Sequence, residues 1–181
     1  MVVPFRTVDE LFAVLAADVI DDGEHISHLD HHLQCAAVLR ADAPADIELQ
    51  VAGLVHDVAS VLTPRPAGDH ALVGAELVRP LLGDRVADLV SGHVEAKRYL
   101  VTTEPSYREI LSENSTATLA RQGDVLDPDD LAAFEASPHA ADWVRLRRAD
   151  DQAKVYGRPV PDLESWRPVV MALSGTAQGA R

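Results

Sequence analysis

Apolar residues recur along the chain at helical spacing, and no stretch sustains the alternation of a strand. The first periodic segment opens on a capping box formed by Thr7 and Glu10, and we expect this helix to end near Gly23. Later segments are separated by glycine, proline and capping residues. The pattern predicts an all-α protein.

Ser27 is expected to cap the second helix, and the third is predicted from Ile47 to about Leu62. The tail after about Ser174 is rich in glycine and alanine and is expected to fray. Further helices are predicted at about 69–82, from 84 through His93 and Lys97, in short pieces at 107–111, 115–121 and 127–136, and last at 140–156.

A length of 181 residues favours a single domain over the whole chain, 1–181, with its core at about 20–156. Hydrophobic residues make up 47% of the sequence but aromatic residues only 4%. The core must therefore consist mainly of leucine, valine and alanine, which suits packed helices.

The formal net charge of −13 disfavours binding to nucleic acid or to an anionic membrane, and an anionic substrate would need a local cationic pocket. The only cysteine, Cys35, cannot form an internal disulfide. The sequence has neither the pattern of a secretion signal nor an apolar run long enough to cross a bilayer. The default location is the cytosol.

A histidine-aspartate doublet, His56-Asp57, lies in the apolar run at 52–59. Burying an imidazole beside a carboxylate is costly unless each group finds a strong partner, and a metal cation is the strongest partner available. The doublet therefore predicts a metal site.

Matching donors lie on other predicted helices, and six of them would suit two ions that share a bridging carboxylate. Imidazole and carboxylate ligands favour iron, manganese or zinc, and the lack of thiolates argues against a structural zinc cage. The competing interpretation is that these histidines are dispersed over surface and core. The candidate ligands are His31, His56, Asp57, His70, His93 and Asp150, whereas His25, His28, His32 and His139 are expected to be solvated.

The choice of Asp150 over Asp151 depends on helical faces. On a continuous helix, Arg147, Asp150 and Lys154 share one face, which would present a carboxylate between two cations. That face fits a metal ligand next to an anion-binding pocket. The alternative is a ladder of surface ion pairs.

Over about residues 20–156 the chain resembles the HD-domain superfamily and, within it, the mixed-valent di-iron oxygenases such as myo-inositol oxygenase and the phosphonate-degrading oxygenases. The doublet alone indicates only the superfamily, most of whose members hydrolyse phosphate esters. The lysine in AKRYL is typical of the phosphonate branch. The matching segments are LDHHLQ at 29–34, GLVHD at 53–57, HALVGA at 70–75, HVEAKRYL at 93–100, LSENS at 111–115, QG at 122–123 and LRRADDQAK at 146–154.

This resemblance implies an oxygenase with two iron ions, Fe(II) and Fe(III), bridged by Asp57. It would use O2 to cleave the carbon–phosphorus bond of a small 1-hydroxyalkylphosphonate, unsubstituted or carrying an amino or trimethylamino group, and release phosphate and a carboxylate. Asp57 and Lys97 would be catalytic. The implied substrate-binding residues are Glu24, Lys97, Ser115, Gln122, Arg147 and Lys154, with Glu24 receiving an ammonium group unless it is an ordinary exposed loop acid.

Two positions depart from the family pattern. Asp21 stands where the family can place a tyrosine, and Ser60 stands where it can place a histidine. Two other functions stay open. One is a metal-dependent phosphohydrolase acting on a nucleotide or small phosphomonoester, and the other is a non-catalytic metal-binding or phosphonate-binding module.

Overall fold

The computed structural model describes residues 3–17, 25–62 and 70–179. Every regular element in these ranges is helical, which confirms the predicted all-α class. None of these helices is long and apolar enough to cross a membrane. The elements are α1 (Val8–Leu15), α2 (His28–Asp42), α3 (Ile47–Val55), α4 (Val58–Leu62), α5 (His70–Leu82), α6 (Asp84–Thr103), η1 (Pro105–Ile110), α7 (Glu113–Arg121), α8 (Pro128–Ala136), α9 (Ala140–Gln152), η2 (Leu163–Trp166) and α10 (Arg167–Gly179).

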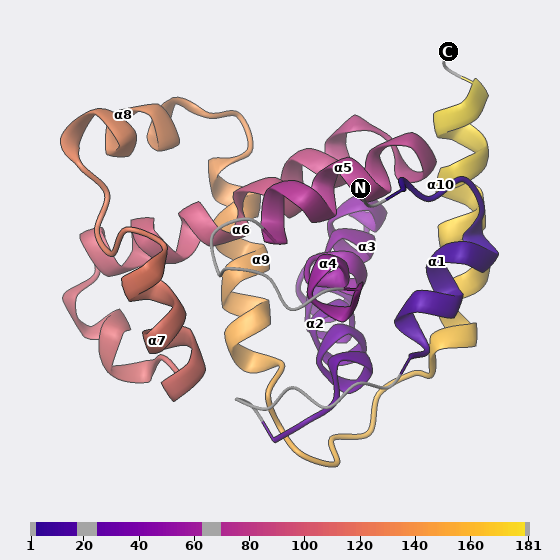
Figure 1. The fold of residues 1–181 in the computed structure, drawn as a ribbon, viewed down its shortest axis with the longest axis horizontal. Coiled ribbons are helices and arrows are strands. Elements are labelled where there is room, and N and C mark those ends of the chain that lie inside the picture. The colour runs from indigo at the N-terminus through magenta and orange to yellow at the C-terminus, as the bar shows by residue number, and fades with distance from the viewer. Residues whose placement is uncertain (1–2, 18–24, 63–69, 180–181) are drawn as a thin grey trace.

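Helices α2, α3, α6 and α9 pack against one another, and α5 packs on α6 (Figure 1). In the same view α1 and α10 lie on one side of this group, and α7 and α8 lie on the opposite side. The main core is built largely from leucine, valine and alanine, as the composition predicted. Of the four helices packed against one another, α2, α6 and α9 carry residues of the candidate site, and α3 ends beside it.

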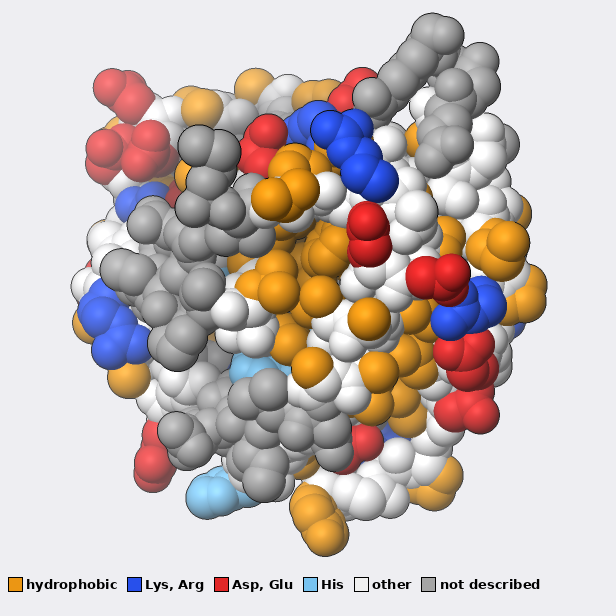
Figure 2. All heavy atoms as spheres, turned by 45° about the vertical axis from the view of Figure 1, so that its right-hand side comes forward, with side chains coloured by type: hydrophobic (Ala, Val, Ile, Leu, Met, Phe, Trp, Pro, Cys, Tyr) orange, Lys and Arg blue, Asp and Glu red, His pale blue; other side chains and the backbone are white. Residues whose placement is uncertain are grey.

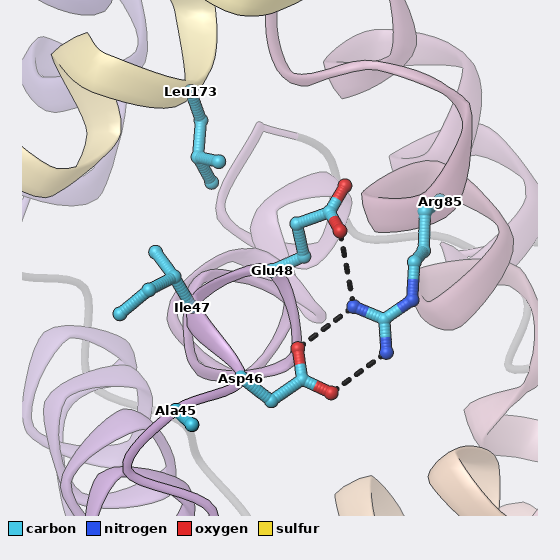
Figure 3. A pocket seen from close by; sticks show the side chains of 6 residues that line it. All are labelled: Ala45, Asp46, Ile47, Glu48, Arg85 and Leu173. Carbon is cyan, nitrogen blue, oxygen red and sulfur yellow. Dashed lines mark hydrogen bonds and ion pairs between the residues drawn. The ribbon is translucent and has the colours of Figure 1, made fainter.

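The first three helices each begin with a side-chain cap, and the caps of the first two were predicted. Thr7 and Glu10 form the capping box of α1, and Ser27 caps α2. Asp46 caps α3 and is also held by Arg85 of α6, through two hydrogen bonds of 2.7 Å (Figure 3). Arg85 therefore ties the start of α3 to α6, and the carboxylates around it neutralise its charge at the surface pocket that it lines.

The third predicted helix is broken, which corrects the expectation of one helix from Ile47 to Leu62. It divides into α3 and α4 at His56-Asp57. The imidazole Nδ1 of His56 donates to the carbonyl of Gly53 at 2.9 Å, the acceptor that the amide of Asp57 would use in a continuous helix. The break therefore falls on the doublet itself.

The helix predicted to Tyr156 ends at Gln152 instead. The reason lies in contacts with α2, because the side-chain amide of Gln34 binds both the N–H and the carbonyl of Val155. The carbonyl of Ala153 likewise accepts a hydrogen bond from His31 Nδ1. Backbone groups that would extend the helix bind α2 instead.

Helix α10 was not predicted, and the expectation of a frayed tail after Ser174 is wrong as far as Gly179. The fully buried Trp166 and Val170 anchor this end of the chain to the core. At the other end, α1 stops at Leu15 rather than near Gly23, a residue outside the described ranges.

One face of the molecule exposes many apolar side chains among the charged ones (Figure 2). Large exposed apolar residues include Leu72 on α5 and Met171 on α10. Apolar atoms form more than half of the surface of ordinary folded proteins, so this exposure alone indicates no partner.

Close packing fixes α6 against α9 beside the candidate site. A Cβ atom added at Gly92 would lie 2.1 Å from Cε2 of Trp143, so any side chain there would displace the indole. The Trp143 indole N–H donates to the carbonyl of Asp88 at 2.8 Å. Gly92 directly precedes His93, and its lack of a side chain lets α9 pack closely against α6.

Replacing Gly92 with alanine is expected to destabilise the protein, because overpacking of this kind costs about 1–3 kcal/mol. The matched control is Gly175→Ala on α10, where an added Cβ meets no atom within 4 Å. Alanine favours a helix by about 1 kcal/mol over glycine, so the control should unfold at the same or a higher temperature. Equal thermal midpoints for both variants, measured by circular dichroism, would contradict this packing.

Candidate functional site

The six residues expected to bind metal come together as two groups of three donors. Within each group the ligand atoms lie within 4.8 Å of one another. One group is His31, His56 and Asp150, and the other is Asp57, His70 and His93.

In the first group, Nε2 of His31 lies 3.1 Å from Nε2 of His56 and 3.3 Å from Oδ1 of Asp150. The Nδ1 atoms of both imidazoles face backbone carbonyls, of Ala153 and Gly53, at 2.9 Å. A carbonyl can only accept, so each Nδ1 carries a proton, and the neutral form of each ring has its lone pair at Nε2. Two ring nitrogens and a carboxylate oxygen at these distances suit a shared cation, either a proton or a metal ion.

The second group repeats the arrangement. Nε2 of His70 lies 3.0 Å from Nε2 of His93 and 3.3 Å from Oδ1 of Asp57. Nδ1 of His93 donates to the carbonyl of Val90 at 2.7 Å, which again leaves Nε2 free to accept. Such backbone contacts set the tautomer of metal-binding histidines in known sites.

Asp57 faces both groups with different oxygens. Its Oδ2 lies 3.6 Å from Nε2 of His56 and 3.9 Å from Nε2 of His31, while its Oδ1 faces His70 and His93. Oδ1 is buried and accepts no hydrogen bond from the described residues. A buried carboxylate oxygen without a donor is costly, and a cation at each oxygen would remove that cost. The donor set therefore fits two adjacent ions.

The pKa shifts of three donor residues also fit a bound cation. Burial lowers the pKa of His56 to about 4, so its Nε2 keeps a lone pair at neutral pH. Burial also disfavours charge on His31, but Asp150 outweighs it and raises the pKa of His31. For Asp57, burial opposes ionisation, yet His56 and the other histidines hold its pKa well below the usual range.

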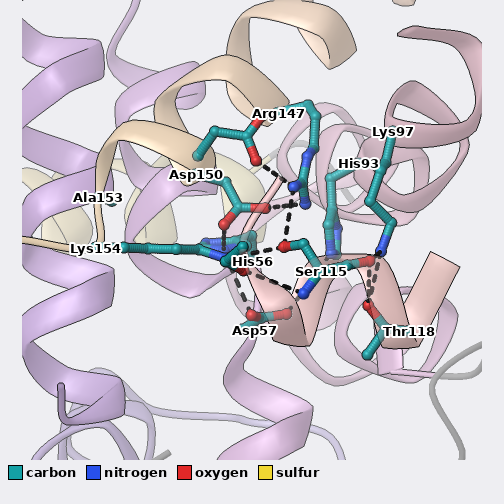
Figure 4. A network of polar contacts seen from close by, with 12 residues as sticks. His56, Asp57, His93, Lys97, Ser115, Thr118, Arg147, Asp150, Ala153 and Lys154 are labelled. Atoms are coloured by element: carbon teal, nitrogen blue, oxygen red, sulfur yellow. Dashed lines mark hydrogen bonds and ion pairs between the residues drawn. The ribbon is translucent and has the colours of Figure 1, made fainter. Parts of the chain in front are cut away.

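Three cations converge on Ser115, next to the donor groups (Figure 4). Its Oγ accepts from Nζ of Lys154 at 3.0 Å and from Nη2 of Arg147 at 3.3 Å, and its carbonyl accepts from Nζ of Lys97 at 3.4 Å. Lys97 and Lys154 are the only lysines in the sequence. We call these four residues the cationic pocket.

Lys97 is buried, with 3% of its surface exposed, and its hydrogen bonds go to neutral oxygens. The closer of these is Oγ1 of Thr118 at 2.9 Å. Burial and the neighbouring Arg147 lower the pKa of Lys97 to about 7. A bound dianion would stabilise its charged form.

Arg147 links the cationic pocket to the donor groups. Its Nη1 donates to Oδ2 of Asp150, and its Nη2 donates to Ser115 and Asp151. Asp151 thus pairs with Arg147 and with the hydroxyl of Tyr107, and of the two aspartates only Asp150 belongs to a donor group.

The sequence also matches a known protein family and named relatives. A model of the HD domain family matches residues 28–129, more than half of the chain. This chain belongs to the HD domain family. Hydroxymethylphosphonate dioxygenase of Gimesia maris is 36% identical over 156 residues, which cover 81% of this chain and 77% of that protein.

A second relative of this HD-family protein is the [1-hydroxy-2-(trimethylamino)ethyl]phosphonate dioxygenase (glycine-betaine-forming) of Leisingera caerulea, 30% identical over 87% of this chain and 84% of that protein. An uncharacterized protein of Acanthamoeba polyphaga mimivirus is 28% identical over 82% of this chain and 72% of its own length. The resemblance to the phosphonate-degrading branch is therefore confirmed.

The other positions singled out in the sequence lie at the end of α7, on α4 or outside the described ranges. Gln122 is the C-cap of α7, at the opposite end of that helix from Ser115. Glu24 and Asp21 fall outside the described residues. Ser60 is half-buried in α4.

The expectation that His32 is solvated is wrong. Its ring is fully buried and packs edge-on against His56, with ring centroids 5.7 Å apart. Burial holds its pKa well below the usual range, so it is neutral. Helix α2 is covered by both α3 and α9, so the consecutive residues His31 and His32 are both buried.

Sequence reasoning missed Tyr107 and Thr118. Tyr107 lies in the broken stretch after α6, where helical periodicity gives no burial signal, yet it is only 2% exposed. The spacing of Thr118, three residues after Ser115 on a predicted helix, could have placed it on the same face.

Lys97 is expected to titrate with a midpoint near pH 7 instead of the ordinary lysine value of 10.5. Its charge should be present below this midpoint and lost as the pH rises through it, and anion affinity should fall over the same range. Lysine labelled with 13C at Cε gives two NMR signals in this chain, and Lys154→Arg identifies the signal of Lys97. Titration of Lys97 near pH 10 would contradict its desolvated environment.

Proposed function

We propose that this protein is an HD-family oxygenase that uses O2 to cleave the carbon–phosphorus bond of a small 1-hydroxyalkylphosphonate. For hydroxymethylphosphonate the balanced reaction consumes one O2 and yields formate, phosphate and one proton. The main support for this proposal is the cluster of three cations around Ser115, which lies beside the two donor groups. The names of two relatives support the same chemistry.

We propose that two iron ions are held by the two donor groups, with Asp57 as the shared ligand. Iron bound there would supply electrons for O2 reduction and Lewis acidity toward the substrate hydroxyl. Manganese and zinc also accept imidazole and carboxylate ligands, but zinc has no redox chemistry.

The chain's own contribution is to bind and orient the phosphonate. Lys97, Arg147 and Lys154 would neutralise its two charges, and Ser115 would offer a hydroxyl. The chain carries a net charge of −13, so affinity for a dianion must come from such a local cluster. Because Arg147 contacts both Ser115 and Asp150, a phosphonate in the cationic pocket would place its C1 carbon near the metal centre.

Other features of the proposed function rest on the sequence. Cytosolic location and the lack of nucleic-acid or membrane partners stay predictions from composition and charge. Selection of an amino-substituted or trimethylamino-substituted substrate by Glu24 is likewise a proposal from the family resemblance.

Iron binding is expected to follow the two donor groups. Wild-type protein loaded with iron under anaerobic conditions should retain two ions per chain after gel filtration, measured by mass spectrometry of the metal. His31→Ala and His70→Ala should each lose one ion, while Asp57→Ala should lose both. His139→Ala, outside both groups, is the control and should keep two. Equal metal content in all four variants would refute the ligand assignment.

Iron-loaded protein is expected to release phosphate from hydroxymethylphosphonate in air and to release none without O2. Lys97→Ala should raise KM roughly tenfold to a hundredfold, because a hydrogen bond to a charged group is worth about 1.5–3 kcal/mol. The matched control is Arg98→Ala, because Arg98 is adjacent to Lys97 in the sequence but pairs with Glu95.

Metal content should be unchanged in both variants. Loss of metal from Lys97→Ala would contradict the assignment of Lys97 as a substrate-binding residue. Phosphate release that continues under strict anaerobiosis would instead support a hydrolase.

A further inference from the structure

The hydroxyl of Tyr107 connects two parts of the site through Arg147. It accepts a hydrogen bond of 2.9 Å from Nε of Arg147 and donates one to Oδ2 of Asp151. Asp151 in turn accepts from Nη2 of the same guanidinium. Tyr107, Asp151 and Arg147 thus form a closed triangle of hydrogen bonds in a buried position.

All three guanidinium nitrogens of Arg147 have partners. Nε binds Tyr107, Nη1 binds Asp150, and Nη2 binds Asp151 and Ser115. Arg147 is 4% exposed, so water cannot replace a lost partner readily. A planar guanidinium held at all three nitrogens has its position and its plane fixed.

The ring of Tyr107 is fixed by a small core of its own. It packs with Leu100 and Val101 of α6 and with Leu119 of α7, the helix that carries Ser115. Its hydroxyl reaches α9, which carries Arg147 and Asp150. One side chain therefore sets the position of the Ser115 helix relative to the helix of the candidate metal ligand.

We propose that Tyr107 and Asp151 are positioning residues, which hold Arg147 where it binds the phosphonate and keeps Asp150 turned toward His31 and His56. The proposal rests on the proposed function, because Arg147 serves there as a phosphonate ligand. Burial raises the pKa of Tyr107 above its usual range, so its hydroxyl keeps its proton and remains a donor to Asp151.

The test compares Tyr107→Phe with Tyr99→Phe in the iron-loaded protein. Both variants lose one phenolic hydroxyl and keep the ring, and the ring of Tyr99 stacks on Phe134 at 4.4 Å instead of contacting Arg147. For Tyr107→Phe we expect KM for hydroxymethylphosphonate to rise about tenfold, with little change in kcat and the same iron content. For Tyr99→Phe both constants should stay at the wild-type values.

A purely structural role would lower kcat in proportion to the folded fraction and leave KM unchanged, so that result would overturn the proposal. The dissociation constant of hydroxymethylphosphonate, measured by calorimetry without O2, should rise by the same factor as KM. Asp151→Ala should weaken binding similarly and add little to Tyr107→Phe.

A double-mutant cycle with Arg147→Lys separates action through Arg147 from other effects, because lysine lacks the Nε–H that Tyr107 accepts. In the Arg147→Lys background, Tyr107→Phe should change the dissociation constant by less than about twofold. A full tenfold effect there would mean that Tyr107 acts by another route.

The outcomes for wild-type protein separate this inference from the proposed function. Wild-type protein that neither binds nor cleaves hydroxymethylphosphonate would overturn both. Wild-type protein that does both, with unchanged binding in Tyr107→Phe, would overturn only the positioning role.

Discussion

The arrangement of the site depends on the cost of burying imidazole nitrogens and carboxylate oxygens close together. Nε2 atoms of paired imidazoles approach to 3.1 Å in one group and 3.0 Å in the other, with carboxylate oxygens beside them. In water such groups would bind solvent, but here helices α2, α3, α6 and α9 enclose most of them. A metal cation in each group would attract all of these donor atoms at once. Asp57 couples the groups because each of its oxygens faces one of them.

In the cationic pocket, positively charged side chains are brought close together instead of metal-binding donors. An acidic chain places both of its lysines and a buried arginine around one serine. These like charges repel one another, and burial adds to the cost, as the lowered pKa of Lys97 indicates. A dianionic ligand would offset that cost. Arg147 binds both Asp150 and Ser115, so its guanidinium couples the charge at the donor groups to the charge in the cationic pocket.

Much of the site could be predicted because its signals are local. The doublet His56-Asp57 in an apolar run and the histidines on separate helices identified the six donors that the structure brings together. Membership of the HD family also followed from short motifs.

The sequence-based predictions that failed concern features that depend on tertiary contacts. Gln34 and His31 bind backbone groups at 153–155 and end α9 early, so Lys154 reaches Ser115 from a loop rather than from the predicted helical face. The break at His56 and the burial of His32 have the same origin. Glycine and alanine in the tail suggested fraying, but the buried Trp166 gives α10 a place to pack.

The most direct test of the central claim is a crystal structure of the iron-loaded protein with anomalous diffraction measured on both sides of the iron absorption edge. Two iron peaks are expected beside Asp57, one among His31, His56 and Asp150 and the other beside His70 and His93. A single peak, or peaks away from Asp57, would contradict that claim.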